Sequence, residues 1–419
     1  MWRLTDEQRE LRDQIRTVVL EKIRPRVLEM DENCEYPHDI HATLAAENLM
    51  GLAIPSSYGG RDATEVSWCA YVEELAKISG TVSLMAAYVK LVSLPILIAG
   101  SEEQKQEFLP PLVSGERYGS YALTEPDAGS DPAALQTRAE RHGDVWVLNG
   151  RKRFIGNAGH SDTYVVFART GDPGSKGISC FVVDGKAPGV SAEPLRTMGM
   201  PGWKLGAPRF EDVEVPAANL LGNEGDGFKI AMMTFDRSRP TVAAQAVGVG
   251  QGAIDLAMDY ASRRHTMGEP LLAHQGLQFK LAGMEADVAA ARALAFQAAT
   301  FVDEGDKRMT KLSAMAKLVA SDTAMRVTTE AVQILGGNGY LKEFPAERMM
   351  RDAKVLQIYE GANEIQRLVI LRQMVKQLSE REAVWPEAMP GAEGVATGES
   401  APSPEEQAAS PQEEVGARA

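Results

Sequence analysis

Apolar residues recur at helical spacing in the first part of the chain. One stripe, with intervals of three or four residues, comprises Leu11, Ile15, Val18, Val19, Ile23 and Val27. Thr5 and Gln8 have the spacing of a capping box, in which each side chain bonds the backbone of the other residue. Pro110-Pro111 is typical of a break between elements. The pattern predicts a helical domain over residues 1–120.

The pattern changes near residue 121, where short runs of β-branched and aromatic residues replace the helical period. Such runs occupy residues 145–148, 164–167 and 178–183. Asn149-Gly150 lies between two runs and has the composition of a tight hairpin turn, because glycine readily adopts positive φ. The pattern predicts a small β barrel or sandwich over residues 121–225.

Long helical segments return after residue 226. They cover residues 228–265, 275–303, 309–335 and 363–378, which is longer than most globular helices. Such lengths suit an antiparallel four-helix bundle over residues 226–380. Residues 381–419 are rich in Pro, Ala, Gly, Ser and Glu, which indicates a disordered acidic tail. The expected fold class is α+β, with helical domains on either side of a small β domain.

Composition and charge restrict the protein class. The chain has 419 residues, 44% of them hydrophobic, and a net charge of −14. An acidic chain lacks the basic surface that non-specific nucleic-acid binding or a polybasic membrane anchor requires. The three cysteines form no C-x-x-C pair, which favours a reducing compartment. Pro95 interrupts the most apolar stretch, and the first residues do not resemble a signal peptide. We therefore expect a cytoplasmic protein without a membrane span.

Two patterns imitate binding motifs. Gly248-Val249-Gly250-Gln251-Gly252 lacks the spacing of a dinucleotide fingerprint and sits in a helical stretch, so close helix packing is the better interpretation. His38 and His41 have no acidic or thiolate companion at metal-ligand spacing. No metal site is expected.

Four segments carry groups suited to chemistry, namely residues 121–131, 152–158, 333–340 and 357–367. Thr124 and Ser130, with nearby glycines, suit either a flat heterocycle or diphosphate, or a polar turn. The glycines after Gln333 equally suit a helix stop. Glu360 precedes Gly361 in a short break, so its carboxylate and exposed backbone N–H suit a general base. An exposed loop glutamate is the alternative.

Together, these motifs resemble the acyl-CoA dehydrogenase family, and the resemblance covers about residues 4–380. It implies FAD between the β domain and the C-terminal helices, with a neighbouring subunit of a homotetramer completing the site. It also implies an acyl-CoA substrate. The implied cofactor-binding residues are Leu123, Thr124, Ser130, Phe154, Gly156, Arg264, Thr266, Gln275, Gln333, Gly336, Gly337, Ala362 and Glu364.

The resemblance also implies the reaction. Glu360 matches the family's catalytic base, and Ser238 occupies the helix position that carries the base in other members but cannot ionise. The base removes the α-proton while the β-hydrogen leaves as hydride to the flavin, which gives a trans-2-enoyl-CoA. The implied substrate-binding residues are Ser130, Asp236, Arg239 and Gly361.

The chain departs from the family pattern at several implied flavin contacts. Phe154 and Gly156 stand where Trp and Thr are usual, Met267 replaces Phe, and Ala362 replaces Thr. The hydrogen-bond donor that Gly156 lacks is therefore open, with its own backbone N–H as one candidate. Trp203 lies in a second divergent segment, and it suits either the flavin edge, docking of the electron acceptor, or loop packing.

The acyl group is not readable from the sequence, and straight, branched, cyclic, aromatic and dicarboxylic groups all stay open. Tyr88 and Leu91 suggest an apolar pocket, whereas Lys90 is equally compatible with the surface. The leading hypothesis is a dehydrogenase that passes electrons to an electron-transfer flavoprotein. The alternatives are an acyl-CoA oxidase that uses O2, and a flavin-less acyl-CoA or acyl-carrier binding protein.

Overall fold

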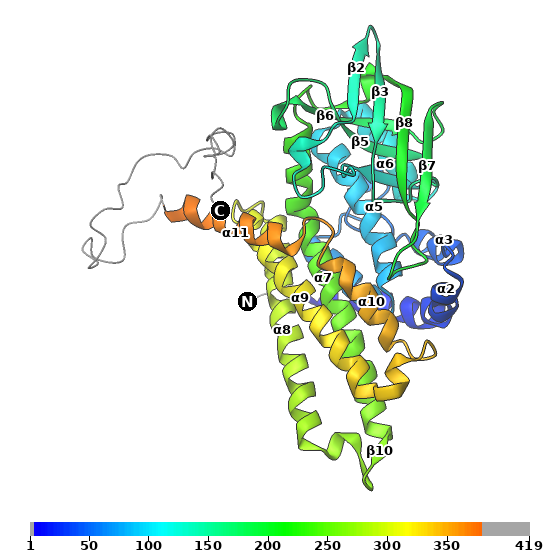
Figure 1. The fold of residues 1–419 in the computed structure, drawn as a ribbon, viewed down its shortest axis with the longest axis vertical. Helices are drawn as coiled ribbons and strands as arrows, with labels where there is room; N and C mark the ends of the chain where they lie inside the picture. The colour runs from blue at the N-terminus through cyan, green and yellow to red at the C-terminus, as the bar shows by residue number, and fades with distance from the viewer. Residues whose placement is uncertain (1–3, 379–419) are drawn as a thin grey trace, which may run out of the picture. The chain divides into compact units, whose positions relative to one another are not determined.

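Helices occupy the first and last parts of the chain, and strands lie between them (Figure 1). The structure is a computed structural model and describes residues 4–378, so the predicted tail over 381–419 lies outside the described residues. The N-terminal helices are α1 (Asp6–Val18), α2 (Val27–Asn33), α3 (His38–Ala46), α4 (Glu65–Ile78), α5 (Gly80–Ala99) and α6 (Glu102–Val113).

The predicted start and apolar stripe of the first helix are confirmed. Thr5 Oγ1 accepts from the Gln8 backbone N–H at 3.2 Å, and Gln8 Oε1 accepts from the Thr5 N–H at 2.9 Å. The stripe is continuous although a π-helical turn over Val19–Ile23 and a 3-10 turn over Arg24–Arg26 separate α1 from α2. Its members Ile15, Val19, Ile23 and Val27 are all at least 98% buried.

The predicted break at Pro110-Pro111 is wrong, and the helix that contains Pro95 is also continuous. Pro95 lies inside α5, and Pro110-Pro111 lies inside α6. By length and composition, α5 could cross a membrane, but its most apolar 18-residue window is 67% buried within the protein. It contacts α4, α6 and the later helix α7 (Gly227–Arg263). Its apolar composition is therefore that of a core helix.

The middle of the chain forms one nine-stranded sheet with the order β4-β8-β3-β2-β5-β6-β9. In addition, β1 pairs in parallel with β5, and β7 pairs with β8. The inward-facing residues form their own core around Trp146, Phe181 and Phe210. The strands are β1 (Gly119–Ala122), β2 (Arg138–His142), β3 (Val145–Arg151), β4 (Ile155–Gly156), β5 (Thr163–Arg169), β6 (Ile178–Asp184), β7 (Val190–Leu195), β8 (Leu205–Pro216) and β9 (Leu220–Leu221).

Asn149-Gly150 is not the predicted hairpin turn. The turn joining β2 and β3 lies at Gly143-Asp144, whereas Asn149 and Gly150 lie inside β3 at a register shift against β8. Asn149 Nδ2 donates to Asp212 Oδ1 at 2.9 Å, and Asn149 Oδ1 accepts from the Asp212 N–H at 2.8 Å. Asn149 and Asp212 lie at a β-bulge between β3 and β8. A bulge, like a tight turn, tolerates unusual φ values.

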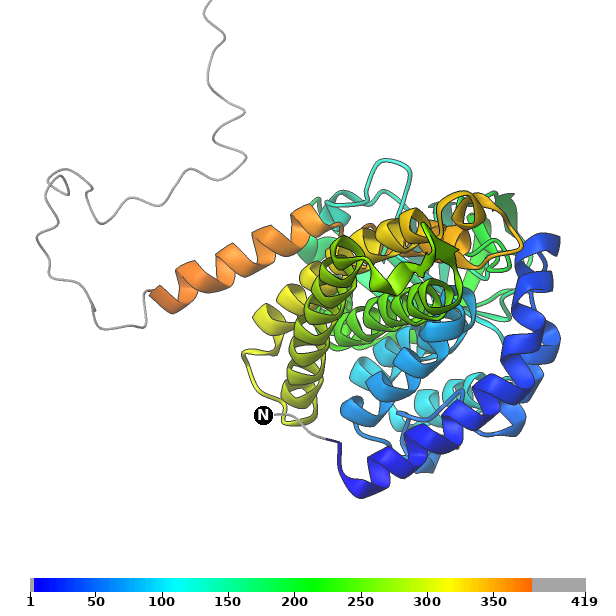
Figure 2. The same ribbon diagram turned by 90° about the horizontal axis from the view of Figure 1, so that it is seen from below.

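Three of the four predicted helices, α7, α8 and α9, pack against one another, with α7 and α9 in the most extensive contact. The fourth helix packed against α7 and α9 is α10, which the pattern did not predict, and the predicted segment 363–378 forms the separate helix α11. The bundle runs from the strands to the small hairpin of β10 (His265–Thr266) and β11 (Glu269–Pro270), and Figure 2 shows the N-terminal helices along one side of it. A Cβ on Gly248 or Gly252 would overlap the α4 backbone at Glu73 or Lys77, which confirms close helix packing there. The other helices are α8 (Gln275–Asp303), α9 (Met309–Leu335), α10 (Ala346–Leu356) and α11 (Asn363–Leu378).

Candidate active site

Glu360 lies in the short loop between α10 and α11 with an unusual backbone conformation. Its φ is 53°, in the left-handed region that residues other than glycine rarely adopt, and Gly361 follows with φ 92°. Gln366 Nε2 donates to the Glu360 carbonyl at 3.2 Å and to the Gly361 carbonyl at 2.7 Å. These bonds hold the loop in the conformation that turns the Glu360 side chain toward α7.

The Glu360 carboxylate is held against α7. Ser238 Oγ donates a hydrogen bond to Glu360 Oε2, and Arg239 Nε lies 3.4 Å from the Glu360 carbonyl. Burial raises the pKa of Glu360, while the Ser238 hydrogen bond and the charges of Arg239 and Lys317 oppose that rise. A half-buried carboxylate whose pKa is raised is a stronger proton acceptor than an exposed one.

Lys317 supports the same loop from α9, although the sequence analysis did not single it out. Its side chain is fully buried, and Nζ donates to the Gly361 carbonyl and to Asn363 Oδ1, both at 2.9 Å. Burial lowers its pKa to about 7, against the raising effect of Glu360. A signal was present in the sequence, because Lys317 falls at helical spacing within the small buried residues Ala314, Ala320 and Ala324.

Asp236 and Arg239, two predicted substrate-binding residues, lie beside Glu360 on α7. Arg239 is 4% exposed and pairs with Asp236 at 3.4 Å. Pro240 cannot donate to the Asp236 carbonyl because it has no N–H, and Ser313 Oγ donates to that carbonyl instead at 2.9 Å. Thr310 Oγ1 donates to the Asp236 carboxylate at 2.6 Å. Side chains of α9 thus hydrogen-bond to the turn of α7 that lies next to Glu360.

Lys90, on α5, hydrogen-bonds to the same turn of α7. The interpretation of this lysine as a surface residue is therefore wrong. It is 5% exposed and forms a buried ion pair with Glu65. Its Nζ also lies 3.3 Å from both the Arg237 carbonyl and Thr241 Oγ1. Unpaired charges are rarely buried, and Glu65 provides the partner here.

On the β-domain side, a buried lysine organises the predicted flavin-facing segments. Lys152 is fully buried and pairs with Glu125 at 2.8 Å. It also donates to the Leu123 carbonyl at 3.1 Å, while the Arg153 N–H donates to the Thr124 carbonyl at 2.9 Å. Burial lowers the pKa of Lys152 to about 8, against the raising effect of Glu125. Leu123 and Thr124 are therefore held next to the 152–156 segment.

The predicted residues of this segment differ in exposure. Phe154 is 57% exposed and has a positive φ of 59°, and Ser130 is also exposed, whereas Gly156 is buried. Tyr88 Oη donates to the Gly156 carbonyl and accepts from the Tyr121 N–H, both at 3.3 Å. The Tyr121 ring packs 5.8 Å from that of Phe235, whose ring also carries the Arg239 guanidinium beside Glu360, so Gly156 and Glu360 border one region. Glu364 is exposed at the start of α11, and Ala362 is half-buried.

Six predicted cofactor residues lie far from that region. At about 1.5 Å of rise per residue, Arg264 lies roughly 37 Å along the α7 axis from Arg239. Asn338 Nδ2 donates to Tyr260 Oη at 3.0 Å, which joins the end of α9 to the end of α7. This second, exposed group comprises Arg264, Thr266, Gln275, Gln333, Gly336 and Gly337.

The backbone is open at both groups. A Cβ placed on Gly129, Gly336 or Gly337 would meet no atom within 4 Å. Glycine surfaces of this kind admit a ligand to the peptide N–H groups. The exposed surface around each group therefore fits part of an extended cofactor, but one chain does not bring the two groups together.

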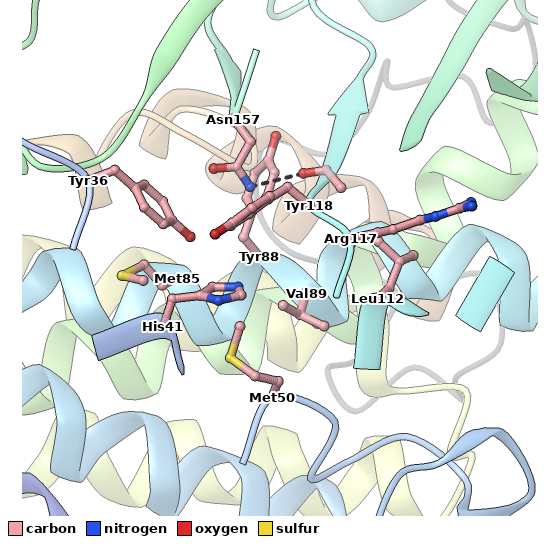
Figure 3. A pocket seen from close by; sticks show the side chains of 11 residues that line it. Tyr36, His41, Met50, Met85, Tyr88, Val89, Leu112, Arg117, Tyr118 and Asn157 are labelled. Atoms are coloured by element: carbon pink, nitrogen blue, oxygen red, sulfur yellow. Dashed lines mark hydrogen bonds between the residues drawn. The ribbon is translucent and has the colours of Figure 1, made fainter. Parts of the chain in front are cut away.

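A small cavity lies beside Tyr88, between α3, α5 and β1. Figure 3 shows that Tyr36, His41 and Asn157 also line it. Its volume is about 10 Å³, roughly that of one water molecule. Asn157 Oδ1 is buried there without a partner, and burial lowers the pKa of His41 to about 4. The cavity fits a bound water rather than a substrate.

No group of three His, Cys, Asp or Glu side chains that could hold a metal comes together within residues 4–378. His38 Nδ1 instead lies 3.1 Å from Tyr118 Oη.

Comparisons with known proteins agree with this architecture. Family models for the N-terminal, middle and C-terminal domains of acyl-CoA dehydrogenases match residues 5–116, 120–213 and 225–375. Cyclohex-1-ene-1-carbonyl-CoA dehydrogenase of Geobacter metallireducens is 43% identical over 380 residues, which cover 90% of this chain and all of that protein.

Two solved structures are similarly close. Butyryl-CoA dehydrogenase of Megasphaera elsdenii superimposes with a TM-score of 0.87 at 42% identity, covering 90% of this chain and all of that one. A chain from a structure described as the electron transferring flavoprotein of Acidaminococcus fermentans gives 0.87 at 41% identity with the same coverage. The three matched domains, the shared fold and this identity over nine-tenths of the sequence show that the chain is an enzyme of the acyl-CoA dehydrogenase family.

Proposed function

We propose that this enzyme oxidises the Cα–Cβ bond of an acyl-CoA thioester to the trans-2-enoyl-CoA, with Glu360 as the base. The observation that carries the proposal is the placement of Glu360, whose carboxylate accepts from Ser238 while Gln366 and Lys317 fix its loop. An exposed glutamate in a mobile loop would have none of these contacts.

Glu360 removes the α-proton in this scheme. The α C–H of a thioester is weakly acidic, so the developing charge on the thioester oxygen needs donors. The Glu360 backbone N–H is one candidate donor, because it donates to no acceptor among the described residues. Arg239 and Asp236 then position the substrate at the adjoining turn of α7.

FAD is the proposed cofactor and, when bound, supplies the acceptor for the β-hydrogen. The residues that would hold its flavin end are those around Leu123, Thr124 and Gly156. The remote group at the end of α7 and α9 would hold the adenine and diphosphate end. Arg264 suits that role because a guanidinium pairs with phosphate oxygens.

The separation of the two groups supports a homo-oligomer, proposed as a tetramer. Because roughly 37 Å of helix lies between Arg239 and Arg264, one FAD would contact the flavin group of one subunit and the diphosphate group of a neighbour. We also propose an electron-transfer flavoprotein as the acceptor and the cytoplasm as the location. The similarity to the Acidaminococcus chain supports that acceptor.

An anaerobic visible spectrum of the purified protein tests this function. The spectrum is recorded during titration with straight, branched, cyclic and dicarboxylic acyl-CoAs. Bleaching of the flavin bands by one class is the expected result and identifies the acyl group. Absence of flavin would favour the binding-protein alternative, and turnover with O2 as fast as with a dye acceptor would favour the oxidase.

A further inference from the structure

The space for a side chain at residue 156 is already filled. A Cβ built on Gly156 would lie 2.7 Å from Trp203 Cζ2, 2.9 Å from Trp203 Nε1 and 2.7 Å from Tyr88 Cζ. Such contacts are far closer than normal van der Waals separations. The residues at 156 and 203 are therefore coupled, because a side chain at 156 would require the Trp203 indole to move.

The loop that carries Trp203 is held in place by its neighbours. The Met200 N–H donates to Asp352 Oδ1 at 2.6 Å, and the Trp203 N–H donates to the Met200 carbonyl at 2.9 Å. The indole packs edge-on against Tyr88, with ring centroids 5.0 Å apart, and lies 6.2 Å from the Tyr36 ring. The ring is thus positioned before any ligand arrives, and its ordering adds little entropy cost to binding.

The indole N–H of Trp203 has no hydrogen-bond acceptor among residues 4–378. Nε1 can only donate, and a buried tryptophan normally satisfies this group. The side chain is only 6% exposed, but Nε1 is not among the fully covered polar atoms without a partner, so this atom keeps some access to solvent. Tyr88 lies against both residues, since its hydroxyl donates to the Gly156 carbonyl and its ring contacts Trp203.

Resting on the proposed function, we infer that Trp203 replaces a side chain at position 156 in the flavin site. Its indole N–H donates to an acceptor atom on the edge of the bound isoalloxazine, and its ring forms one wall there. Trp203 is thus a cofactor-binding residue, and packing of the loop is the means by which it is positioned.

Affinity for FAD separates a donor from a packing residue. Apoprotein of each variant is titrated with FAD, and both the dissociation constant and the visible bands are recorded. Trp203→Phe keeps a ring and removes the N–H, so we expect about fivefold weaker binding and displaced flavin bands. The matched control is Trp146→Phe in the β-domain core, which should leave both unchanged. If Trp203→Phe binds FAD with the wild-type constant and bands, the inference is wrong.

A second pair of variants, which moves the side chain from position 203 to position 156, tests the coupling to Gly156. This pair also tests the inference if Trp203→Phe does not fold. Gly156→Thr alone should weaken FAD binding about ten- to hundredfold, because its side chain overlaps both rings. Adding Trp203→Ser makes room for the threonine and should restore binding to within about fivefold of wild type. A double variant that folds, by circular dichroism, but does not regain FAD would overturn the inference.

The result also distinguishes this inference from the proposed function. If wild-type protein takes up no FAD, both fail. If wild-type protein takes up FAD and bleaches with an acyl-CoA while Trp203→Phe behaves as wild type, only the role of Trp203 fails.

Discussion

The two ends of α7 offer the cofactor and substrate very different surroundings. Near Ser238 and Arg239, polar side chains are buried and bond to α5, α9 and the Glu360 loop. Near Arg264, the predicted cofactor residues are exposed, and the side chains of Arg264, Thr266, Gln275 and Gln333 make no hydrogen bond within residues 4–378. The first end is therefore complete within one chain and is called the complete end, whereas the side chains of the second, the exposed end, face solvent. In the proposed function, a cofactor and a neighbouring subunit would cover the exposed end.

The largest expected effect is at the complete end. Glu360→Gln removes the proton acceptor but keeps the size and shape of the side chain, so flavin reduction by acyl-CoA should slow by about 10²- to 10⁴-fold. Stopped-flow absorbance measures this rate, and equilibrium titration should show that FAD and acyl-CoA still bind. Glu343→Gln, at an exposed position, is the control. A near wild-type rate for Glu360→Gln would move the base to Asp236.

Lys317 makes the stability of the complete end depend on pH. Its pKa is lowered from 10.5 to about 7 by burial, so between these values the unfolded chain binds the proton that the folded chain has released. The free energy of unfolding of wild type should therefore rise relative to Lys317→Met by about 1.4 kcal/mol per pH unit from pH 7 upward. Urea unfolding at several pH values measures this slope.

The exposed Lys307→Met is the control and should show no such slope. Loss of the Lys317 charge should also raise the pKa of Glu360, which moves the acid limb of flavin reduction to higher pH. A pH-independent difference between wild type and Lys317→Met would mean that the pKa of this lysine is not lowered in the folded enzyme.

The exposed end should respond in cofactor affinity rather than in stability. Arg264→Gln removes a charge-assisted bond to a phosphate, so FAD binding should weaken about ten- to hundredfold. The free energy of unfolding of the apoprotein should change by less than about 0.5 kcal/mol, because the residue is exposed. Arg263→Gln, next in sequence and paired with Asp259, is the matched control. Equal losses in both variants would contradict a specific role for Arg264.

The smallest effect tests a buried group that has no partner at the complete end. Tyr121 Oη is buried without a hydrogen bond in the described chain, so Tyr121→Phe should raise the free energy of unfolding by about 1 kcal/mol. Tyr164→Phe should lower it, because Tyr164 Oη accepts from the Gly159 N–H at 3.0 Å. Thermal unfolding of the two variants without ligand compares the signs.

Patterns of neighbouring residues predicted where helices start and which faces they bury. They predicted less well where one element ends and the next begins. The capping box at Thr5 and the stripe from Ile15 to Val27 depend on residues a few positions apart, and both were predicted correctly. Asn149-Gly150 has the composition of a turn but forms a bulge, because pairing with β8 holds both residues inside β3. Pro110-Pro111 was expected to separate elements, but packing keeps α6 continuous across it.

The sequence by itself determined the order of helical and β regions, the family resemblance and the residue types of the site, because these depend on periodicity and on motifs read along the chain. Only the tertiary structure decided which residues meet. It buried Lys90 and Lys317 beside the Glu360 region. It also placed the Trp203 indole in the space that a side chain at residue 156 would occupy. It also separated Arg264 from Arg239 by the length of a helix. Such contacts join positions up to hundreds of residues apart, and burial and charge pairing in the folded chain select them.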